Sequence, residues 1–232
     1  MTIWTTLARA GTASGDDIIL RQRGEIFEIR YNGIELMSNV NHQSEEQLAL
    51  RAMRRLDFSA RKILIGGLGL GFTLRAVLDL AVQEAEVTVC ELIPEVAAWN
   101  NGPLGHLAQH PLDDPRTTLL IEDVQAHLAR VDKVYDLILL DTDNGPDFLV
   151  RTGNTNLYSQ SGLVTVANAL ATGGLAAFWS ATVSAEFESR LSEQPWSWRR
   201  EDIALVTGRV DAMHHIYSCR QNAAVFGVLR AA

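Results

Sequence analysis

The stretch Ile63-Leu64-Ile65-Gly66-Gly67-Leu68-Gly69-Leu70-Gly71-Phe72 joins an apolar run to a turn in which four of six positions are glycine. The apolar run predicts a buried strand, and FTLRAVLDLAV after it predicts a helix. Glycines between a strand and a helix permit a tight turn and let a ligand approach the backbone. The helix N-terminus offers free N–H donors to that ligand. We therefore predict a ligand-binding turn whose contact residues are Gly66, Gly67, Gly69 and Gly71.

The spacing of these glycines distinguishes two classes of nucleotide ligand. The dinucleotide fingerprint G-x-G-x-x-G fails, because Phe72 occupies the third glycine position counted from Gly67. The pattern present is G-x-G-x-G, which is typical of folds that bind S-adenosylmethionine. A nicotinamide-dependent oxidoreductase is therefore disfavoured. A glycine-rich turn that binds nothing is the alternative.

Apolar runs and helical segments alternate after this turn. Further buried strands are predicted at 87–92, 117–122, 135–141 and 175–181. Strand, helix and strand in series predict an α/β fold with a doubly wound, Rossmann-type sheet like that of S-adenosylmethionine-dependent methyltransferases. Near the C-terminus, strand-like segments without a helix between them predict an antiparallel hairpin at the sheet edge. Within it, alternation directs His214 and His215 to opposite sides.

Residues 18–39 have the pattern of a small β-meander. Apolar and charged side chains alternate over 27–31, and Asn32-Gly33 supplies a hairpin turn, since both residues tolerate a positive φ. We predict an N-terminal β-meander over residues 1–43 and an α/β domain over residues 44–232.

Composition limits the classes of partner. The 232 residues are 47% apolar and carry 20 basic and 28 acidic side chains, a formal net charge of −8. This balance disfavours nucleic-acid binding by phosphate neutralisation. No apolar run has the length of a membrane helix, and no secretion signal is visible. Cys90 and Cys219 lie far apart and without metal-type spacing. We therefore expect a cytoplasmic protein without a metal, whose partner is a small molecule.

Acidic residues follow the second and third predicted strands. Glu91, 25 residues after Gly66, ends the second strand beside Leu92. An acid at this distance accepts hydrogen bonds from ribose hydroxyls in such folds. Asp123 follows the third strand, where it would accept the exocyclic amine of an adenine or cap the next helix. These two interpretations of Asp123 are compatible.

The loop Asp141-Thr142-Asp143-Asn144 follows the fourth predicted strand. Ligands of open α/β sheets bind outside the carboxyl ends of the strands, so this loop faces the predicted cleft. Two carboxylates on a short loop can position a cationic amine or take its proton, and they favour a sulfonium nearby. We predict that Asp141 and Asp143 are catalytic. Local turn chemistry explains Asn144 but explains Asp141 poorly.

These motifs together resemble the polyamine aminopropyltransferases, or spermidine synthase family, over about residues 18–182. The resemblance is carried by IGGLGLGFTLRAVLD, VTVCELIPEV and YDLILLDTDNGP. It implies an S-adenosylmethionine-type fold, often dimeric, that transfers an aminopropyl group from decarboxylated S-adenosylmethionine to an amine. It also implies that the glycine turn holds the donor, Glu91 the ribose and Asp123 the adenine. Asp141 would bind and deprotonate the amine, and Asp143 would approximate the family's second acid.

The sequence departs from the family at two places. The family's loop reads GGGDGG, and its aspartate, which contacts the donor's amino group, is replaced here by Gly69. The family's Tyr-His/Gln-Glu stretch corresponds roughly to Glu45-Glu46-Gln47, where Ser44 and Gln47 also predict a helix capping box. Glu45 or Glu46 could hold an amine, although acids in a first helical turn are expected for the helix dipole alone. The predicted acceptor site comprises Glu46, Asn144, Tyr158 and Trp179.

Gly69 decides which donor we expect. A loop aspartate would repel the carboxylate of intact S-adenosylmethionine, and a glycine removes that repulsion. We therefore expect an S-adenosylmethionine-dependent methyltransferase acting on a small acceptor such as an amine. The first alternative is a polyamine aminopropyltransferase that uses decarboxylated S-adenosylmethionine, and the second is a non-catalytic protein that binds an adenosyl ligand. A homodimer is the predicted assembly.

Overall fold

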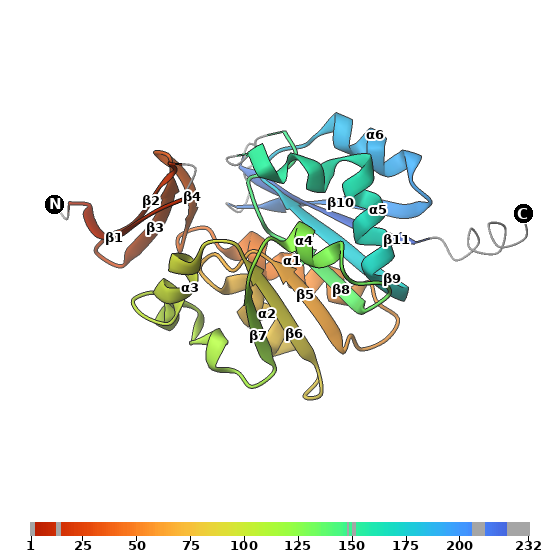
Figure 1. Cartoon of the computed structure of the whole chain (residues 1–232), viewed down its shortest axis with the longest axis horizontal. Coiled ribbons are helices and arrows are strands. Elements are labelled where there is room, and N and C mark those ends of the chain that lie inside the picture. Colours follow the sequence, from red (N-terminus) through yellow and green to blue (C-terminus); the bar gives the residue numbers. More distant parts are fainter. Residues whose placement is uncertain (1–2, 13–14, 148, 150–151, 206–211, 222–232) are drawn as a thin grey trace, which may run out of the picture.

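In a computed structural model, which describes residues 3–12, 15–147, 149, 152–205 and 212–221, the chain forms two β-sheets (Figure 1). The smaller sheet is antiparallel, in the order β1-β2-β3-β4. Its strands are β1 (Thr5–Gly11), β2 (Asp17–Arg23), β3 (Ile26–Tyr31) and β4 (Ile34–Ser38). This sheet is the predicted meander with one additional strand. The sequence pattern did not predict β1, because most of its side chains are exposed and its core-facing residues include only the small side chains Ala8 and Ala10.

The larger sheet has seven strands in the order β10-β11-β9-β8-β5-β6-β7. They are β5 (Lys62–Gly66), β6 (Glu86–Glu91), β7 (Thr117–Ile121), β8 (Tyr135–Leu140), β9 (Leu170–Ser180), β10 (Trp196–Ala204) and β11 (Met213–Gln221). Strands β5 to β9 are parallel, and β11 and β10 continue the sheet antiparallel to them. The α/β fold class and its C-terminal edge hairpin are therefore confirmed.

Helices cover both faces of the larger sheet, and three short 3₁₀ helices lie in two of the connections. The helices are α1 (Gln43–Arg54), α2 (Phe72–Leu80), α3 (Pro94–Asn100), α4 (Val124–Leu128), α5 (Gln160–Ala169) and α6 (Ala185–Glu193). The 3₁₀ turns are η1 (Gly105–Ala108), η2 (Pro111–Asp113) and η3 (Thr152–Tyr158). No helix among the described residues is long and apolar enough to cross a membrane.

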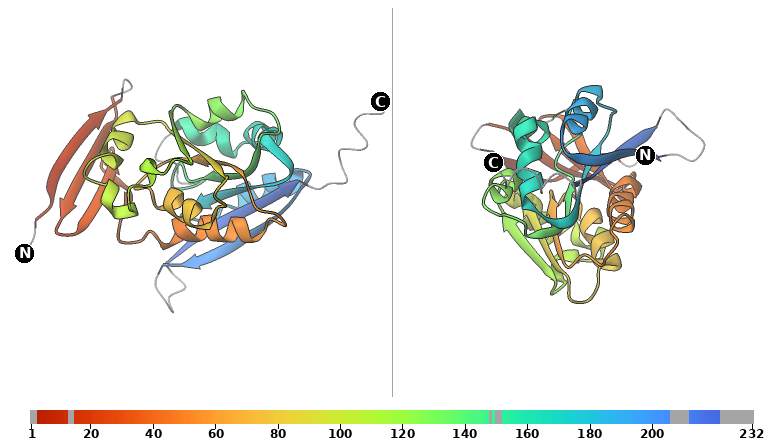
Figure 2. Two further views of the ribbon diagram at one scale, coloured as in Figure 1. Left: turned by 90° about the horizontal axis from the view of Figure 1, so that it is seen from below. Right: turned by 90° about the vertical axis from the view of Figure 1, so that its right-hand side faces the viewer.

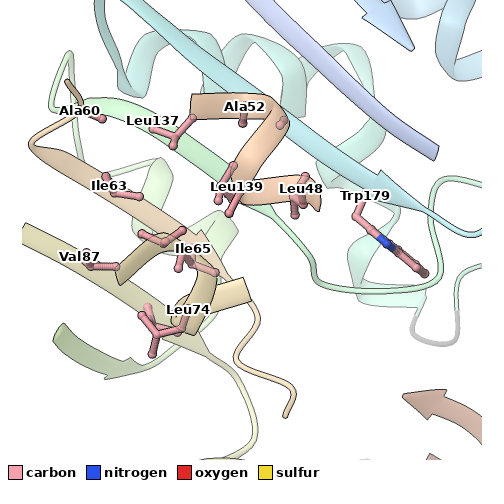
Figure 3. Close-up of a cluster of buried hydrophobic side chains, with 14 of the residues drawn as sticks. Leu48, Ala52, Ala60, Ile63, Ile65, Leu74, Val87, Leu137, Leu139 and Trp179 are labelled. Carbon is pink, nitrogen blue, oxygen red and sulfur yellow. The ribbon is translucent and has the colours of Figure 1, made fainter. Parts of the chain in front are cut away.

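Alternation along the central strands divides the core into two layers. Ile63 and Ile65 of β5 pack with α1 and α2 on one face, and Leu64 between them packs with α4 and α5 on the other. Figure 3 shows the first layer, with Trp179 at its border. This packing fixes the carboxyl ends of β5, β6 and β8 side by side, so the loops after them meet at one edge of the sheet.

The smaller sheet lies at one end of the molecule, beside α3 (Figures 1 and 2). Its buried residues Ile18, Leu20 and Ile29 form a third core with Leu70 of the glycine turn and Trp99 of α3. The meander therefore covers the turn from outside. The division of the chain at residues 43 and 44 stays a prediction.

The beginning of α1 differs from the predicted capping box. The N-cap residue is His42, without a side-chain capping bond, and α1 begins at Gln43. Ser44 lies inside the first turn, where its hydroxyl donates to the Glu45 carboxylate. Gln47 accepts a hydrogen bond from Arg51 instead of closing a box. Ser44 is fully buried, and its second partner, His214, lies on β11, which a local motif does not reveal.

Candidate active site

The glycine turn is held between the ends of two neighbouring strands. Gly67 has a φ of +92°, and a Cβ there would lie 2.1 Å from the backbone oxygen of Asp141. The Gly67 N–H donates to the carbonyl of Cys90 in β6 at 2.9 Å, and the Asp141 N–H donates to Gly66 at 2.9 Å. Only glycine fits this conformation and this contact. The turn therefore places the backbone of Gly67 directly against the loop that carries Asp141.

Glu91 ties the same turn to the end of β6. Its two carboxylate oxygens accept the backbone N–H groups of Leu68 at 3.0 Å and Ile93 at 2.8 Å. Burial raises the pKa of Glu91, and these backbone donors act in the opposite direction. Glu91 therefore holds the glycine turn against the end of β6.

A hollow lies between the turn, the end of β6 and the meander; we call it the first hollow. The predicted cofactor residues that line it are Gly67, Gly69, Glu91, Leu92 and Asp123, whereas Gly66 and Gly71 line neither this hollow nor the one beside it. Apolar walls come from Ile93, Val96 and Val124. Asp123 also caps α4, because its Oδ1 accepts the Gln125 N–H at 2.8 Å. Both sequence interpretations of Asp123 are therefore compatible with its position.

A second hollow adjoins the first. The two share Leu36, Met37, Gly69, Asp141, Thr142 and Asp143, and the second is also lined by Glu45, Phe72, Thr73, Asn144 and Trp179. Asp141 is half-buried at the border, where its Oδ2 accepts the Thr73 hydroxyl at 2.7 Å. Burial raises the pKa of Asp141 to about 6, although the Thr73 hydrogen bond opposes that rise. The sequence predicted Asp141 at this edge, and Thr73 was missed.

Glu45 is a second carboxylate, besides Asp141, that lines the second hollow. It projects from α1 into the second hollow, where burial and the nearby Asp141 charge raise its pKa to about 7. Glu46, which the sequence favoured, is exposed, forms an ion pair with His42 at 3.2 Å and lines neither hollow. Helical spacing could have identified Glu45. It precedes the fully buried Leu48 and Ala49 by three and four positions, so it lies on the same buried face of the helix.

Asp143 lies deeper than Asp141 and holds the acidic loop. Its buried carboxylate accepts the Asn144 N–H at 2.8 Å and the Asn154 side-chain amide at 2.9 Å. It lines both hollows, whereas Asn144 lines only the second. Asp143 can therefore contribute negative charge to both hollows while it fixes the loop.

The two predicted aromatic residues lie in different places. Tyr158 is buried in the core against Phe178 and Phe187 and lines neither hollow. Trp179 lines the second hollow, and its ring meets that of His214 edge-on, with centroids 4.6 Å apart. The buried indole N–H of Trp179 has no hydrogen-bond partner among the described residues. The structure brings Trp179 to the site and leaves Tyr158 in the core.

Among the residues that the structure describes, one group of side chains has metal-ligand chemistry. Cys90, Glu122 and His127 place one potential ligand atom each within 4.8 Å of the others. Both imidazole nitrogens of His127 are already used, at 2.8 Å from Glu122 and 2.6 Å from the Tyr135 hydroxyl. Burial raises the pKa of the Cys90 thiol to about 12, which disfavours the thiolate that a metal needs. We assign no metal to this group.

Comparison with known proteins identifies the family. The model of the spermine/spermidine synthase domain matches residues 42–192. The chain belongs to this family. Polyamine aminopropyltransferase 2 of Pseudomonas aeruginosa is 40% identical over 90 residues, which are 37% of this chain and 26% of that protein. The chain thus matches only about a quarter of the length of this curated relative.

Two solved structures share the fold of this family member. A spermidine synthase in complex with the transition-state analogue AdoDATO has a TM-score of 0.78, at 18% identity, and the match covers 94% of this chain and 74% of that chain. The spermidine synthase of Thermotoga maritima has a TM-score of 0.75, at 19% identity, over 94% and 73%. The predicted resemblance to the spermidine synthase family is confirmed.

The expectation of methyl transfer is wrong. The matched family and the curated relative are aminopropyltransferases, which is the alternative that the sequence left open. The inference from Gly69 considered one position of one loop. Glu45, Asp141 and Asp143 surround the same space, so the loss of one carboxylate does not remove its negative charge.

Proposed function

We propose that this chain transfers an aminopropyl group from decarboxylated S-adenosylmethionine to a small amine, such as a polyamine. The observation that carries the proposal is Asp141, a carboxylate at the border of two adjoining hollows. One hollow suits a nucleoside thioether and the other suits a cation. This arrangement brings an electrophilic carbon and an amine together beside one base.

The donor fits the first hollow in this proposal. The walls of Ile93, Val96 and Val124 would pack against the adenine, with Asp123 as acceptor for its exocyclic amine. Glu91 would accept from the ribose hydroxyls. The sulfonium would then lie near Gly69, at the opening into the second hollow.

The acceptor fits the second hollow. Glu45 and Asp141 supply negative charge for ammonium groups, and Asp143 adds to it. Phe72 and Trp179 form the aromatic wall, which suits the methylene chain and the cationic ends of a polyamine. Amine binding lowers the pKa of both raised carboxyls, since a cation favours their ionised forms.

The chemistry is an in-line displacement. The neutral amine nitrogen attacks the aminopropyl carbon next to the sulfonium, and a C–N bond forms as the C–S bond breaks. The electron pair of the C–S bond passes to sulfur, which leaves as neutral methylthioadenosine. The attacking amine transfers one proton to Asp141. Because the leaving group is already activated, the protein chiefly orients the amine and deprotonates it.

The test is product analysis with purified protein. The chain is incubated with decarboxylated S-adenosylmethionine and a set of diamines of increasing length, and mass spectrometry follows the amines and methylthioadenosine. We expect one amine to gain an aminopropyl group with equal release of methylthioadenosine, and intact S-adenosylmethionine to give no methylated product. Donor binding without turnover on any amine would overturn the proposal and leave an adenosyl-binding protein. Whether the chain dimerises stays a prediction.

A further inference from the structure

A buried hydrogen-bond chain connects the second hollow to the C-terminal hairpin. The Ser44 hydroxyl lies 2.6 Å from Oε2 of Glu45 and 2.8 Å from Nδ1 of His214. Ser44 is fully buried, whereas His214 of β11 is half-buried and packs against Trp179. These hydrogen bonds therefore lead from the Glu45 carboxylate in the second hollow, through the Ser44 hydroxyl, to the His214 imidazole, which is closer to the surface.

The single hydroxyl proton of Ser44 allows two arrangements of this chain. When Glu45 is ionised, Ser44 donates to Glu45 and His214 must donate its Nδ1–H to Ser44. When Glu45 is protonated, Glu45 can donate to Ser44, and Ser44 then donates to an unprotonated Nδ1. The protonation state of Glu45 thus sets the tautomer of His214.

We propose that Glu45, Ser44 and His214 form the route by which the proton taken from the acceptor amine leaves the second hollow. Asp141 passes the amine's proton to Glu45 through a water molecule in the second hollow that both carboxylates line. Glu45 then gives its proton to Ser44, Ser44 gives its own to Nδ1 of His214, and Nε2 releases a proton to water. One proton moves from Glu45 to solvent, and each group ends with its normal number of bonds. The kinetic role of this route rests on the proposed function.

The electrostatic surroundings suit such a route. The titratable groups that face Glu45 are Asp141 and Asp143 from the loop after β8, Glu46 on its own helix and His214 on β11. The charge of Asp141 favours the protonated form of Glu45, which lines the same hollow. Once both hollows are filled by substrates, water reaches Asp141 less easily, and a path through the protein becomes useful.

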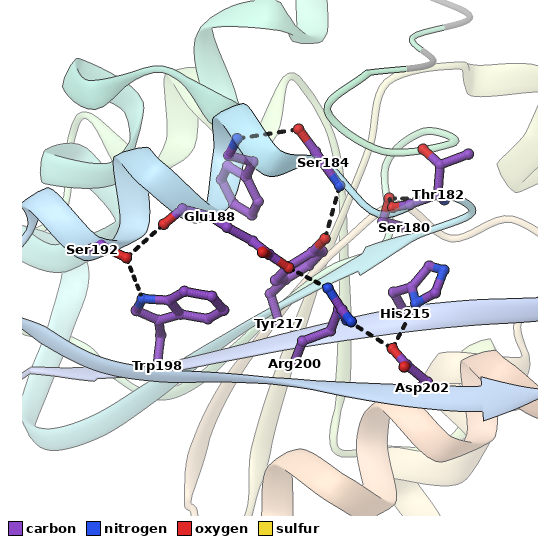
Figure 4. Close-up of polar contacts among 11 residues, drawn as sticks. Ser180, Thr182, Ser184, Glu188, Ser192, Trp198, Arg200, Asp202, His215 and Tyr217 are labelled. Atoms are coloured by element: carbon purple, nitrogen blue, oxygen red, sulfur yellow. Dashed lines mark hydrogen bonds and ion pairs between the residues drawn. The ribbon is translucent and has the colours of Figure 1, made fainter.

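His214 is fitted for a tautomer exchange because it stays neutral. Burial and the adjacent His215 lower the pKa of His214 to about 4. At neutral pH the ring therefore accepts a proton at one nitrogen only while it releases one from the other. His215 faces a different set of partners, since its Nδ1 pairs with Asp202 at 2.8 Å, and Arg200 binds the same Oδ1 (Figure 4).

The first test needs no turnover. Nitrogen NMR of histidine-labelled protein reports which ring nitrogen of His214 carries the proton, from about pH 5.5 to about pH 8.5. We expect the Nδ1–H tautomer to predominate at high pH and the Nε2–H tautomer at low pH, with the change centred where Glu45 titrates. Glu45→Gln should abolish the change, and Glu46→Gln should leave it intact. A tautomer that does not vary with pH would overturn the inference, whatever the protein's activity.

The second test separates proton transfer from positioning. His214→Asn keeps an amide N–H donor near the place of Nδ1 but cannot exchange tautomers. Ser44→Ala removes the hydroxyl that links Glu45 to His214. We expect both variants to lower kcat by about 10-fold or more, with amine KM within about twofold and partial rescue by a small buffer base. His215→Asn is the control and should retain wild-type kcat. If His214→Asn has the wild-type kcat and pH profile, the hydrogen bonds among Glu45, Ser44 and His214 are only structural and the proposed route is wrong.

The two tests distinguish this inference from the proposed function. If wild-type protein forms no aminopropyl product while the tautomer of His214 still follows Glu45, the proposed function fails and the coupling stands. If product forms but the tautomer is fixed, the proposed function stands and the route is wrong.

Discussion

The Thr73 hydroxyl donates a 2.7 Å hydrogen bond to the Asp141 carboxylate, which joins the first turn of α2 to the end of β8. The first turn of α2 has no acidic residue of its own, so Asp141 supplies the negative charge that a helix N-terminus favours. The same hydroxyl opposes the rise in pKa that burial causes. Because of the Thr73 hydrogen bond, a larger fraction of Asp141 is ionised at neutral pH than burial alone would allow.

Removing that hydrogen bond should change the pH dependence of the reaction. In Thr73→Val the pKa of Asp141 rises further above about 6, so less carboxylate is present at neutral pH. We expect kcat/KM at pH 7 to fall by about 10-fold and the acidic limb of the pH–rate profile to move to higher pH. Thr73→Ser keeps the hydroxyl and should behave like the wild type. An unmoved acidic limb in Thr73→Val would show that this bond does not tune Asp141.

Asp141 itself should matter for turnover and little for donor binding. Asp141→Asn removes the base while keeping the size of the side chain, and we expect kcat to fall by about 10²- to 10⁴-fold. The affinity for methylthioadenosine, measured by titration calorimetry, should change by less than about threefold. Asp132→Asn is a matched control, since Asp132 is exposed before the start of β8. Equal losses in both variants would contradict a specific role for Asp141.

Two glycines with positive φ allow strain and steric contact to be separated. Gly67 has a φ of +92°, and its added Cβ would meet the Asp141 backbone, whereas Gly33 has a φ of +81° and open space around it. We expect Gly33→Ala to lower the free energy of unfolding by about 1 kcal/mol and Gly67→Ala to lower it by more than about 3 kcal/mol. Urea unfolding measures both. If both variants lost a similar amount of unfolding free energy, the Gly67 turn could move away from the Asp141 backbone at little energetic cost.

The raised carboxyl pKa values predict how an amine stabilises the protein. Glu45 and Asp141 bind protons more tightly in the folded state than in the unfolded chain, so their contribution to the free energy of unfolding falls as pH rises from about 4 to about 7. A diamine cation offsets that loss only when the carboxyls are ionised. We expect a diamine to raise Tm more at about pH 8 than at about pH 5.5. The double variant Glu45→Gln with Asp141→Asn should remove the difference, and an equal rise at both pH values would contradict it.

Periodic patterns predicted most of the larger sheet because burial imposes them. Ile63, Leu64 and Ile65 alternate between two cores, and such runs mark the strands and their order along the chain. Strand β1 was missed for the converse reason, because its exposed side chains carry no comparable pattern. The position of β11 between β9 and β10 depends on pairing between distant segments, which the local sequence does not encode.

The candidate site was predicted where it depends on strand ends, and missed where it depends on packing between elements. Asp141 and Asp143 follow a buried strand, and their place at the sheet edge follows from the fold. Glu45 was passed over for Glu46, although the buried face of α1 indicated the correct neighbour. Ser44 and His214 are 170 positions apart in the chain, so their hydrogen bond could not be predicted from sequence spacing.

The central claim is that the two adjoining hollows bind the two substrates of one reaction. The most direct test is the affinity for a single molecule in which both substrates are covalently linked. Titration calorimetry would compare methylthioadenosine with an adduct in which the adenosyl thioether is linked through a propyl chain to a diamine. We predict that the adduct binds at least about 10²-fold more tightly, and that Glu45→Gln removes most of this gain while leaving the affinity for methylthioadenosine unchanged. An adduct that binds no more tightly than methylthioadenosine would contradict the account.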